Sequence, residues 1–142
     1  MKIHFCKSRD IGGSLIRLFL FSRWNHVAIE IGGIVFEAVS RGGVRAVPAN
    51  QFPSLWAEVK TVEVTAPDSG ESLHFLRRQL GKPYDWRALV ALPFRADWHR
   101  SQKWFCSELV AEAMRQGGRD LNLPSHRVTP RDLFVALPEV RR

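Results

Sequence analysis

Short segments rich in β-branched and aromatic residues dominate the first half of the chain and predict β-strands. The segments are Ile3–Cys6, His26–Ile31, Ile34–Val39, Val44–Val47 and Lys60–Val64. Gly32–Gly33 separates the second segment from the third, as in a two-residue β-hairpin, and Gly42–Gly43 precedes the fourth. We therefore expect a three-stranded antiparallel meander, with one further strand before it and another after it.

Helical patterns account for much of the remaining chain. The predicted helices are Leu15–Phe21, Leu73–Leu80, Cys106–Gln116 and a short last helix that begins at Pro130. Asp68 and Glu71 form a capping box ahead of the second helix, and Gly81 ends it. Thr129 caps the last helix, whose first residue is a proline. Because strands and helices are segregated rather than alternating, the pattern predicts one α+β domain over residues 1–142.

The composition narrows the class of protein. With 142 residues, of which 45% are hydrophobic, the chain can bury the core of a single domain. Its two cysteines, Cys6 and Cys106, form no disulfide framework, and no CxxC or HExxH spacing indicates a metal site. We therefore expect neither a cofactor nor a metal.

The charge and the N-terminus bear on partners and location. A net charge of +7 favours anionic partners such as cell wall or lipid headgroups, whereas the scattered basic residues argue against nucleic acid. Arg17 interrupts the apolar run Leu15–Phe21 and no small-residue cleavage site follows it, so we expect no signal peptide and synthesis in the cytoplasm. No segment approaches the roughly 20 apolar residues that a transmembrane helix needs. The oligomeric state is not predicted.

The expected hairpin brings a histidine close to a carboxylate. If Gly32 and Gly33 form the turn, Ala28 lies opposite Glu37, and His26 and Glu37 share one face of the sheet as diagonal neighbours, about 7–8 Å apart. Glu30 shares this face but lies about 13 Å along the strand from His26. Glu37 is therefore the better partner for His26.

Cys106 occupies the start of the most strongly amphipathic predicted helix. It continues the apolar face of that helix, so its side chain is expected to point toward the sheet. The free N–H groups and the dipole at a helix N-terminus favour an anion, and an environment of this kind lowers the pKa of a thiol. An adjacent imidazole adds to this effect and can protonate a leaving group.

Each of these residues also has a structural interpretation. An inward-facing cysteine is more often part of the core, and a single histidine on a strand is usually structural. Glu37 is harder to explain as packing, because an unpaired buried carboxylate is costly. A histidine placed to partner Glu37 shifts the interpretation toward catalysis.

Several segments resemble the permuted NlpC-type papain-like cysteine hydrolases, specifically the YiiX/YaeF-like branch. They occur in the order of that family and cover most of the chain: Ser14–Arg17, Trp24–Ile29, Phe36–Ala38 with Gly43–Val44, Gly81–Asp85, Trp104–Val110 and Val128–Leu133. The resemblance implies a permuted papain-like fold in which an antiparallel sheet or barrel packs against the helix that carries the nucleophilic cysteine.

The same resemblance implies roles for individual residues. Cys106 would be the nucleophile, His26 the base and Glu37 the third polar residue. Tyr84 would lie near the oxyanion site, although an equally good interpretation is a loop aromatic that seals the core after Pro83. The implied activity is cleavage of a peptide amide in peptidoglycan through an acyl-enzyme, in a bacterial or phage protein that acts in the cytoplasm or is delivered to the cell envelope by phage lysis or a secretion system.

Alternatives remain open from the sequence. One is a lipid-type amidase, thioesterase or acyltransferase, although the related lecithin retinol acyltransferase-like enzymes commonly have a second histidine where this chain has Glu37. Another is a catalytically silent basic binding module. Cys6 is expected in the core, and the Trp98–Arg100 segment could face substrate. The sequence offers no partner for His4, His74, His99 and His126. Trp86, Trp98 and Trp104 could line a groove, but packing is the expected role.

Overall fold

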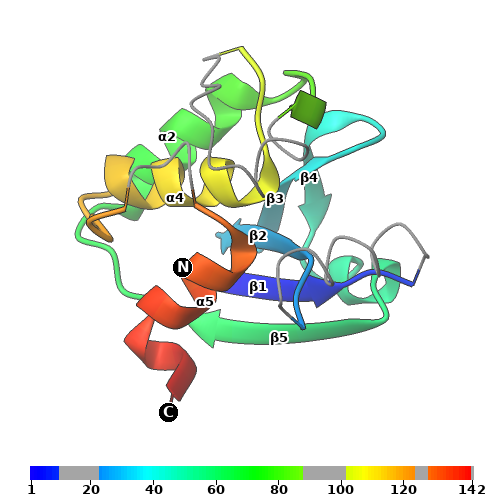
Figure 1. Ribbon diagram of the computed structural model, residues 1–142. Helices are drawn as coiled ribbons and strands as arrows, with labels where there is room; N and C mark the ends of the chain where they lie inside the picture. The colour runs from blue at the N-terminus through cyan, green and yellow to red at the C-terminus, as the bar shows by residue number, and fades with distance from the viewer. Residues whose placement is uncertain (10–22, 88–101, 124–127, 142) are drawn as a thin grey trace.

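The computed structural model describes residues 1–9, 23–87, 102–123 and 128–141, which form a five-stranded antiparallel sheet with its α-helices on one side (Figure 1). In chain order the elements are β1 (Lys2–Lys7), β2 (His26–Ile31), β3 (Ile34–Val39), β4 (Gly43–Pro48), the 3-10 helix η1 (Phe52–Leu55), β5 (Glu58–Glu63), α2 (Ser69–Gln79), α4 (Cys106–Gln116), α5 (Pro130–Ala136) and the 3-10 helix η4 (Pro138–Arg141). The α+β class predicted from the sequence is confirmed. The expected helix Leu15–Phe21 lies outside the described residues.

The strand order is β4-β3-β2-β1-β5. In the β2–β3 hairpin Ile31 pairs with Ile34 and Glu30 with Val35, which confirms the register predicted from the glycine turn. β1 pairs with both β2 and β5. The sequence therefore predicted the meander correctly, but the pairing of β5 with β1 left no local signal, because it joins segments far apart along the chain.

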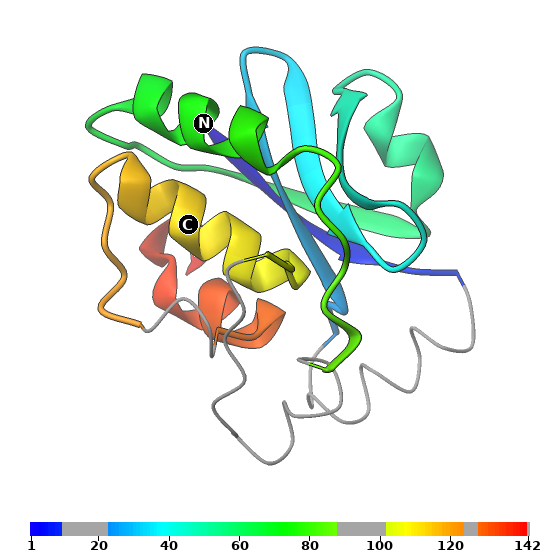
Figure 2. The same cartoon turned by 90° about the horizontal axis from the view of Figure 1, so that it is seen from above.

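The two faces of the sheet are covered differently (Figure 2). Helices α2, α4 and α5 cover the face that carries Val27, Ile29 and Phe36, where the larger core forms. On the opposite face Ala28 and Val35 pack under Phe52 of η1, in a second and smaller core. Alternation along each strand thus supplies apolar side chains to both layers, which explains why β2 and β3 are buried over most of their length.

The ends of the α-helices are fixed by local hydrogen bonds. Asp68 caps α2 by accepting from the N–H groups of Gly70 and Glu71. The capping box expected there is incomplete, because the N–H of Asp68 donates to the carbonyl of Gly117 rather than to the Glu71 side chain. At α5, Thr129 and Asp132 form the reciprocal pair of a full capping box, as the sequence predicted for the cap.

Gly43 anchors the start of β4 to the segment that follows α2. Its φ is +69°, and a Cβ atom built on it would lie 2.2 Å from the carbonyl oxygen of Lys82. The same carbonyl accepts from the N–H of Val44 at 2.9 Å, and the N–H of Gly81 donates to the carbonyl of Val44. This close approach fixes the position of the chain just before Tyr84.

The helices that the structure describes are not long and apolar enough to cross a membrane.

Candidate active site

His26 and Glu37 meet on the face of the sheet opposite the α-helices. His26 is the first residue of β2, and its Nε2 lies 2.8 Å from Oε2 of Glu37 on β3. The Glu37 side chain is fully buried and that of His26 is 9% exposed. The register of the hairpin is what brings these two side chains together, and Glu30 takes no part in the contact.

Cys106 approaches the same histidine from the other layer. It is the first residue of α4, and its side chain is 1% exposed. His26 interacts with this thiol, and since Glu37 holds Nε2, the ring nitrogen left for the sulfur is Nδ1. Helix α4 covers the face of the sheet opposite to His26, so the contact between the two side chains depends on where each residue lies in its own element. His26 lies at the end of its strand and Cys106 at the end of its helix, so the two reach each other around the margin of the sheet.

The protonation of His26 reflects opposing effects. Burial lowers the pKa of the imidazole, whereas its hydrogen bonds to Cys106 and Glu37 and the charges of both partners raise it to about 9. Burial raises the pKa of the Glu37 carboxyl, but its contacts with His26 and Arg45 hold that pKa below the ordinary value. The pair is therefore an imidazolium beside a carboxylate at neutral pH.

Two further side chains contact this pair. Arg45 on β4 donates from Nε to Oε1 of Glu37 at 2.8 Å, and the ring of Trp56 stacks on His26. Sequence reasoning missed both. A signal for Arg45 existed, because continuing the meander past Gly42–Gly43 places it opposite Glu37. No comparable signal existed for Trp56, which arrives from η1 rather than from a paired strand.

Tyr84 lies beside the start of α4. Its ring contacts that of Phe105, the residue that precedes Cys106, with centroids 5.8 Å apart. A β-bridge joins Tyr84 to Trp104. Burial, followed by the nearby charge of Cys106, raises the pKa of the Tyr84 hydroxyl above its ordinary value. The phenol thus keeps its proton and can donate a hydrogen bond close to the thiol.

Glu108 is a buried acid in the first turn of α4 that the sequence analysis did not single out. It accepts from the N–H of Phe105 at 3.2 Å, as the third residue of a helix start does in a capping box. Burial raises the pKa of its carboxyl to about 7, and the charge of Asp85 adds to this, against the lowering effect of the Phe105 hydrogen bond. The capping pattern in the sequence could have identified the contact between Glu108 and the Phe105 N–H, but not the burial of the Glu108 side chain.

The other candidate residues have structural surroundings. His4, for which the sequence offered no partner, contacts Thr61 through Nδ1 and Glu30 through Nε2, and Lys2 pairs with the same Glu30. Cys6 is fully buried in the smaller core, as expected. Trp104 packs on Phe75, and its indole N–H donates to Gln79. Trp86 is 55% exposed beside Tyr84, and His74 is exposed on α2. Trp98, His99, Arg100 and His126 lie outside the described residues.

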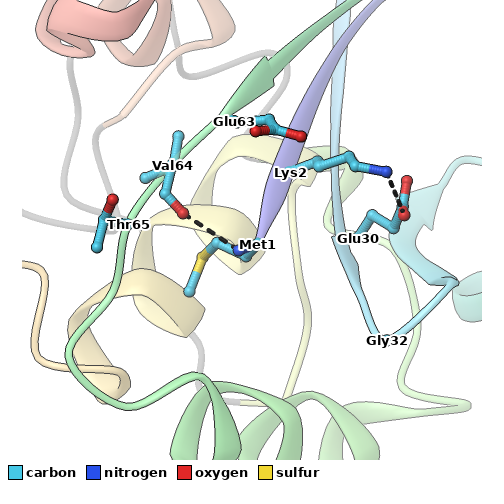
Figure 3. A pocket seen from close by; sticks show the side chains of 7 residues that line it. All are labelled: Met1, Lys2, Glu30, Gly32, Glu63, Val64 and Thr65. Carbon is cyan, nitrogen blue, oxygen red and sulfur yellow. Dashed lines mark hydrogen bonds and ion pairs between the residues drawn. The ribbon is translucent and has the colours of Figure 1, made fainter.

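Two other features bear on this site: the capacity of the described residues to hold a metal ion, and a cavity elsewhere in the sheet. Within the described ranges, no three or more His, Cys, Asp or Glu side chains are grouped so that they could hold a metal ion. A cavity of about 350 Å³ lies at the opposite end of β1 and β2, between Lys2, Glu30 and Glu63 (Figure 3). His26 and Cys6 lie at the other ends of these two strands, so this cavity does not adjoin Cys106.

Comparison with known proteins supports the fold. Neither a protein-family description nor a curated protein sequence matches the chain. Among solved structures, the fold is similar to that of the metalloprotein YiiX from Escherichia coli O157:H7, with a TM-score of 0.62 and 25% sequence identity over 84% of this chain and 67% of that chain. The chain thus has a YiiX-like α+β fold, which fits the branch that its sequence segments resemble.

Proposed function

We propose that the chain is a cysteine hydrolase of the permuted papain-like, NlpC type, in which Cys106 is the nucleophile, His26 the general base and Glu37 the residue that orients His26. The observation that carries this proposal is the position of His26 between a buried carboxylate, 2.8 Å from Nε2, and the thiol at the start of α4. Nucleophile, base and orienting group in this arrangement are what acyl transfer through a covalent intermediate requires.

The chemistry follows from the two ring nitrogens. In the resting pair Nδ1 of His26 already holds the proton that the Cys106 thiol has given up, and the thiolate attacks the substrate carbonyl to form a tetrahedral intermediate. His26 then returns the proton to the leaving amine or alcohol, which leaves an acyl group on the sulfur. Water, deprotonated by the same nitrogen, hydrolyses this thioester and regenerates the thiol.

Donors for the developing oxyanion lie at the start of α4. The first N–H groups of a helix have no partner within the helix, and the N–H of Cys106 belongs to this set. The N–H of Phe105 is already occupied by Glu108. The protonated hydroxyl of Tyr84 is the second donor that we assign to this position, because its ring contacts Phe105 and its pKa responds to the charge of Cys106.

A purely structural role explains the site less well. Glu37 is fully buried and touches two basic side chains, and buried ion networks are often no more stable than well-packed apolar residues of similar volume. A core that needed only stability would not require this arrangement next to a thiol.

The substrate class we assign is the peptide amide of peptidoglycan, on the resemblance to NlpC-type hydrolases. YiiX is described as a metalloprotein. In this chain the oxygens of Glu37 are held by Arg45 and His26, and both nitrogens of His4 have partners, so the described donor atoms do not fit a bound metal. The proposed reaction therefore uses no metal.

The test is hydrolysis of peptidoglycan-derived peptides, with the products and the protein followed by mass spectrometry. We expect cleavage of an amide bond and a transient acyl adduct on Cys106, with both lost in Cys106→Ala and His26→Ala and retained in Cys6→Ala. If only acyl-chain amides or esters were cleaved, the proposal of a cysteine hydrolase would stand, but the proposed peptidoglycan substrate class would be wrong. Cleavage that survives Cys106→Ala would contradict the proposed mechanism.

A further inference from the structure

Arg45 makes the contact with the candidate site that sequence reasoning did not find. It lies directly opposite Glu37 in the β3–β4 ladder. Its Nε and Nη2 approach Oε1 of Glu37 at 2.8 and 2.7 Å, while the other oxygen of that carboxylate faces His26. The Arg45 side chain is 42% exposed, so the guanidinium lies between solvent and a carboxylate that has no exposure of its own.

This position gives Arg45 a task that His26 cannot perform. A buried carboxylate stays ionised only if it is paired, and His26 is an ionised partner only while it holds a proton. In the proposed reaction, which this inference rests on, His26 gains and releases that proton in each cycle. The guanidinium of arginine remains charged at every pH at which the protein is folded.

We propose that Arg45 is a positioning residue of the active site: its guanidinium keeps Glu37 ionised and holds one carboxylate oxygen toward His26, so that the His26–Cys106 pair stays reactive in acid. Arg45 acts through Glu37. The hydrogen bond from Nε and the ion pair with Nη2, both to Oε1, fix the rotation of the carboxylate, which leaves Oε2 aimed at the ring.

The pH dependence must consider every ionisable group around Glu37. Among the described residues, the ionisable groups that interact with Glu37 are His26 on β2, Arg45 on β4, and His4 and Cys6 on β1, and Cys106 on α4 interacts with His26. Trp56, which covers His26 from η1, carries no charge. Only the loss of Arg45 removes a permanent positive charge from the carboxylate, and it lets burial raise the pKa of Glu37.

The experiment measures the rate of alkylation of Cys106 by iodoacetamide against pH in the full chain, with Cys6 as internal reference. In Arg45→Met we expect the acid limb of the profile to move up by about one pH unit, because a cation within about 4–6 Å lowers a carboxyl pKa by about 1–3 units and Arg45 is partly solvated. At neutral pH, where Glu37 is ionised in both proteins, a lower rate in Arg45→Met reports the loss of carboxylate orientation rather than of charge. Arg41→Met is the matched control: Arg41 is exposed in the preceding turn, and its profile should overlay that of the wild type.

Two further variants separate positioning from folding. In a Glu37→Gln background the carboxyl no longer titrates, so adding Arg45→Met should cause no further shift in the acid limb. Comparing Glu37→Gln with the double variant also tests the role of Arg45 if Arg45→Met alone does not fold. Arg45→Lys keeps the charge, so its profile should stay close to that of the wild type.

The outcomes distinguish this inference from the proposed function. If wild-type Cys106 outpaces Cys6 but the Arg45→Met profile overlays the wild type, the role of Arg45 is wrong and the proposed function stands. A further shift in the Glu37→Gln background, or a lysine variant shifted as far as methionine, would also overturn it. If wild-type Cys106 reacts no faster than Cys6, the proposed function fails and this inference fails with it.

Discussion

The rings of His26 and Trp56 lie nearly parallel, with their centroids 4.3 Å apart and an interplanar angle of 14°. Trp56 reaches this position from the residues after η1, on the face of the sheet that the α-helices leave uncovered. The stack covers one face of the imidazole and leaves its two nitrogens in the plane for Glu37 and Cys106. An indole face also favours the protonated ring through a cation–π interaction.

We predict that Trp56→Ala lowers the rate of Cys106 alkylation by about two- to twelvefold, since aromatic pairs of this kind are worth about 0.5–1.5 kcal/mol. Trp56→Phe should retain most of the rate. Within the described part of the chain the indole Nε1 of Trp56 is buried without a hydrogen-bond partner, so the ring face rather than the N–H contributes. Alkylation followed by mass spectrometry measures both variants, and an alanine variant as fast as the wild type would show that the stack does not orient His26.

Glu37→Ala should destabilise the fold by about 3 kcal/mol, because it leaves the nearly buried His26 without its acceptor. This predicted loss of unfolding free energy is at the low end of the range for a broken buried ion pair, since Arg45 can turn toward water. Glu37→Gln should cost less, because the amide oxygen still accepts one of the two hydrogen bonds. Chemical denaturation gives both values. Equal stabilities for the wild type and the alanine variant would mean that the network contributes nothing to folding.

The raised pKa of His26 predicts how stability changes in alkali. Below about pH 6.5 the imidazole is protonated in both states, and the stabilisation is fully present. As the pH rises toward the folded-state value of about 9, the folded protein holds a proton that the unfolded chain has released, so stability falls. Unfolding free energies over this window should therefore decrease more steeply in the wild type than in His26→Gln, which retains Cys6 and Cys106. If the unfolding free energies of the wild type and His26→Gln fell equally with pH, the raised pKa of His26 would be contradicted.

Gly43→Ala should disrupt the site from a distance. Its positive φ and the 2.2 Å approach of the Lys82 carbonyl leave no space for a methyl group, so we expect a loss of more than about 2 kcal/mol. Gly33→Ala is the matched control, because Gly33 also has a positive φ, +79°, but no atom lies within 4 Å of its added Cβ. The control should lose about 1–2 kcal/mol. Similar thermal shifts for both variants would show that the contact with Lys82 is not tight.

The sequence predicted most of the local structure, and the reason lies in turn chemistry. Gly32–Gly33 fixes the β2–β3 register, and the His26–Glu37 contact follows from this register. The cap residues Asp68 and Thr129 identified the starts of α2 and α5. Each of these predictions depends on residues close together in the chain.

What the sequence did not predict depends on contacts between distant segments. The role of Trp56 follows from the packing of η1 on the uncovered face of the sheet, and the partner of His4 from the pairing of β1 with β5, which brings Thr61 to it. Glu108 illustrates a further case, because its burial follows from how α4 packs and not from its spacing. Periodicity identifies the elements but not the way they stack.

The central claim is that His26 makes the sulfur of Cys106 a nucleophile. Cys6 provides an internal reference for a thiol in the core, where burial raises its pKa above the ordinary value, and comparing the ratio of the Cys106 and Cys6 rates in the wild type with that in His26→Ala isolates the effect of His26. The measurement is the ratio of their alkylation rates by iodoacetamide at about pH 6, where an ordinary thiol is largely protonated. We predict that Cys106 reacts at least tenfold faster than Cys6 in the wild type and that His26→Ala removes this preference. Equal, slow reaction of both thiols in the wild type would contradict the account and favour a catalytically silent binding domain.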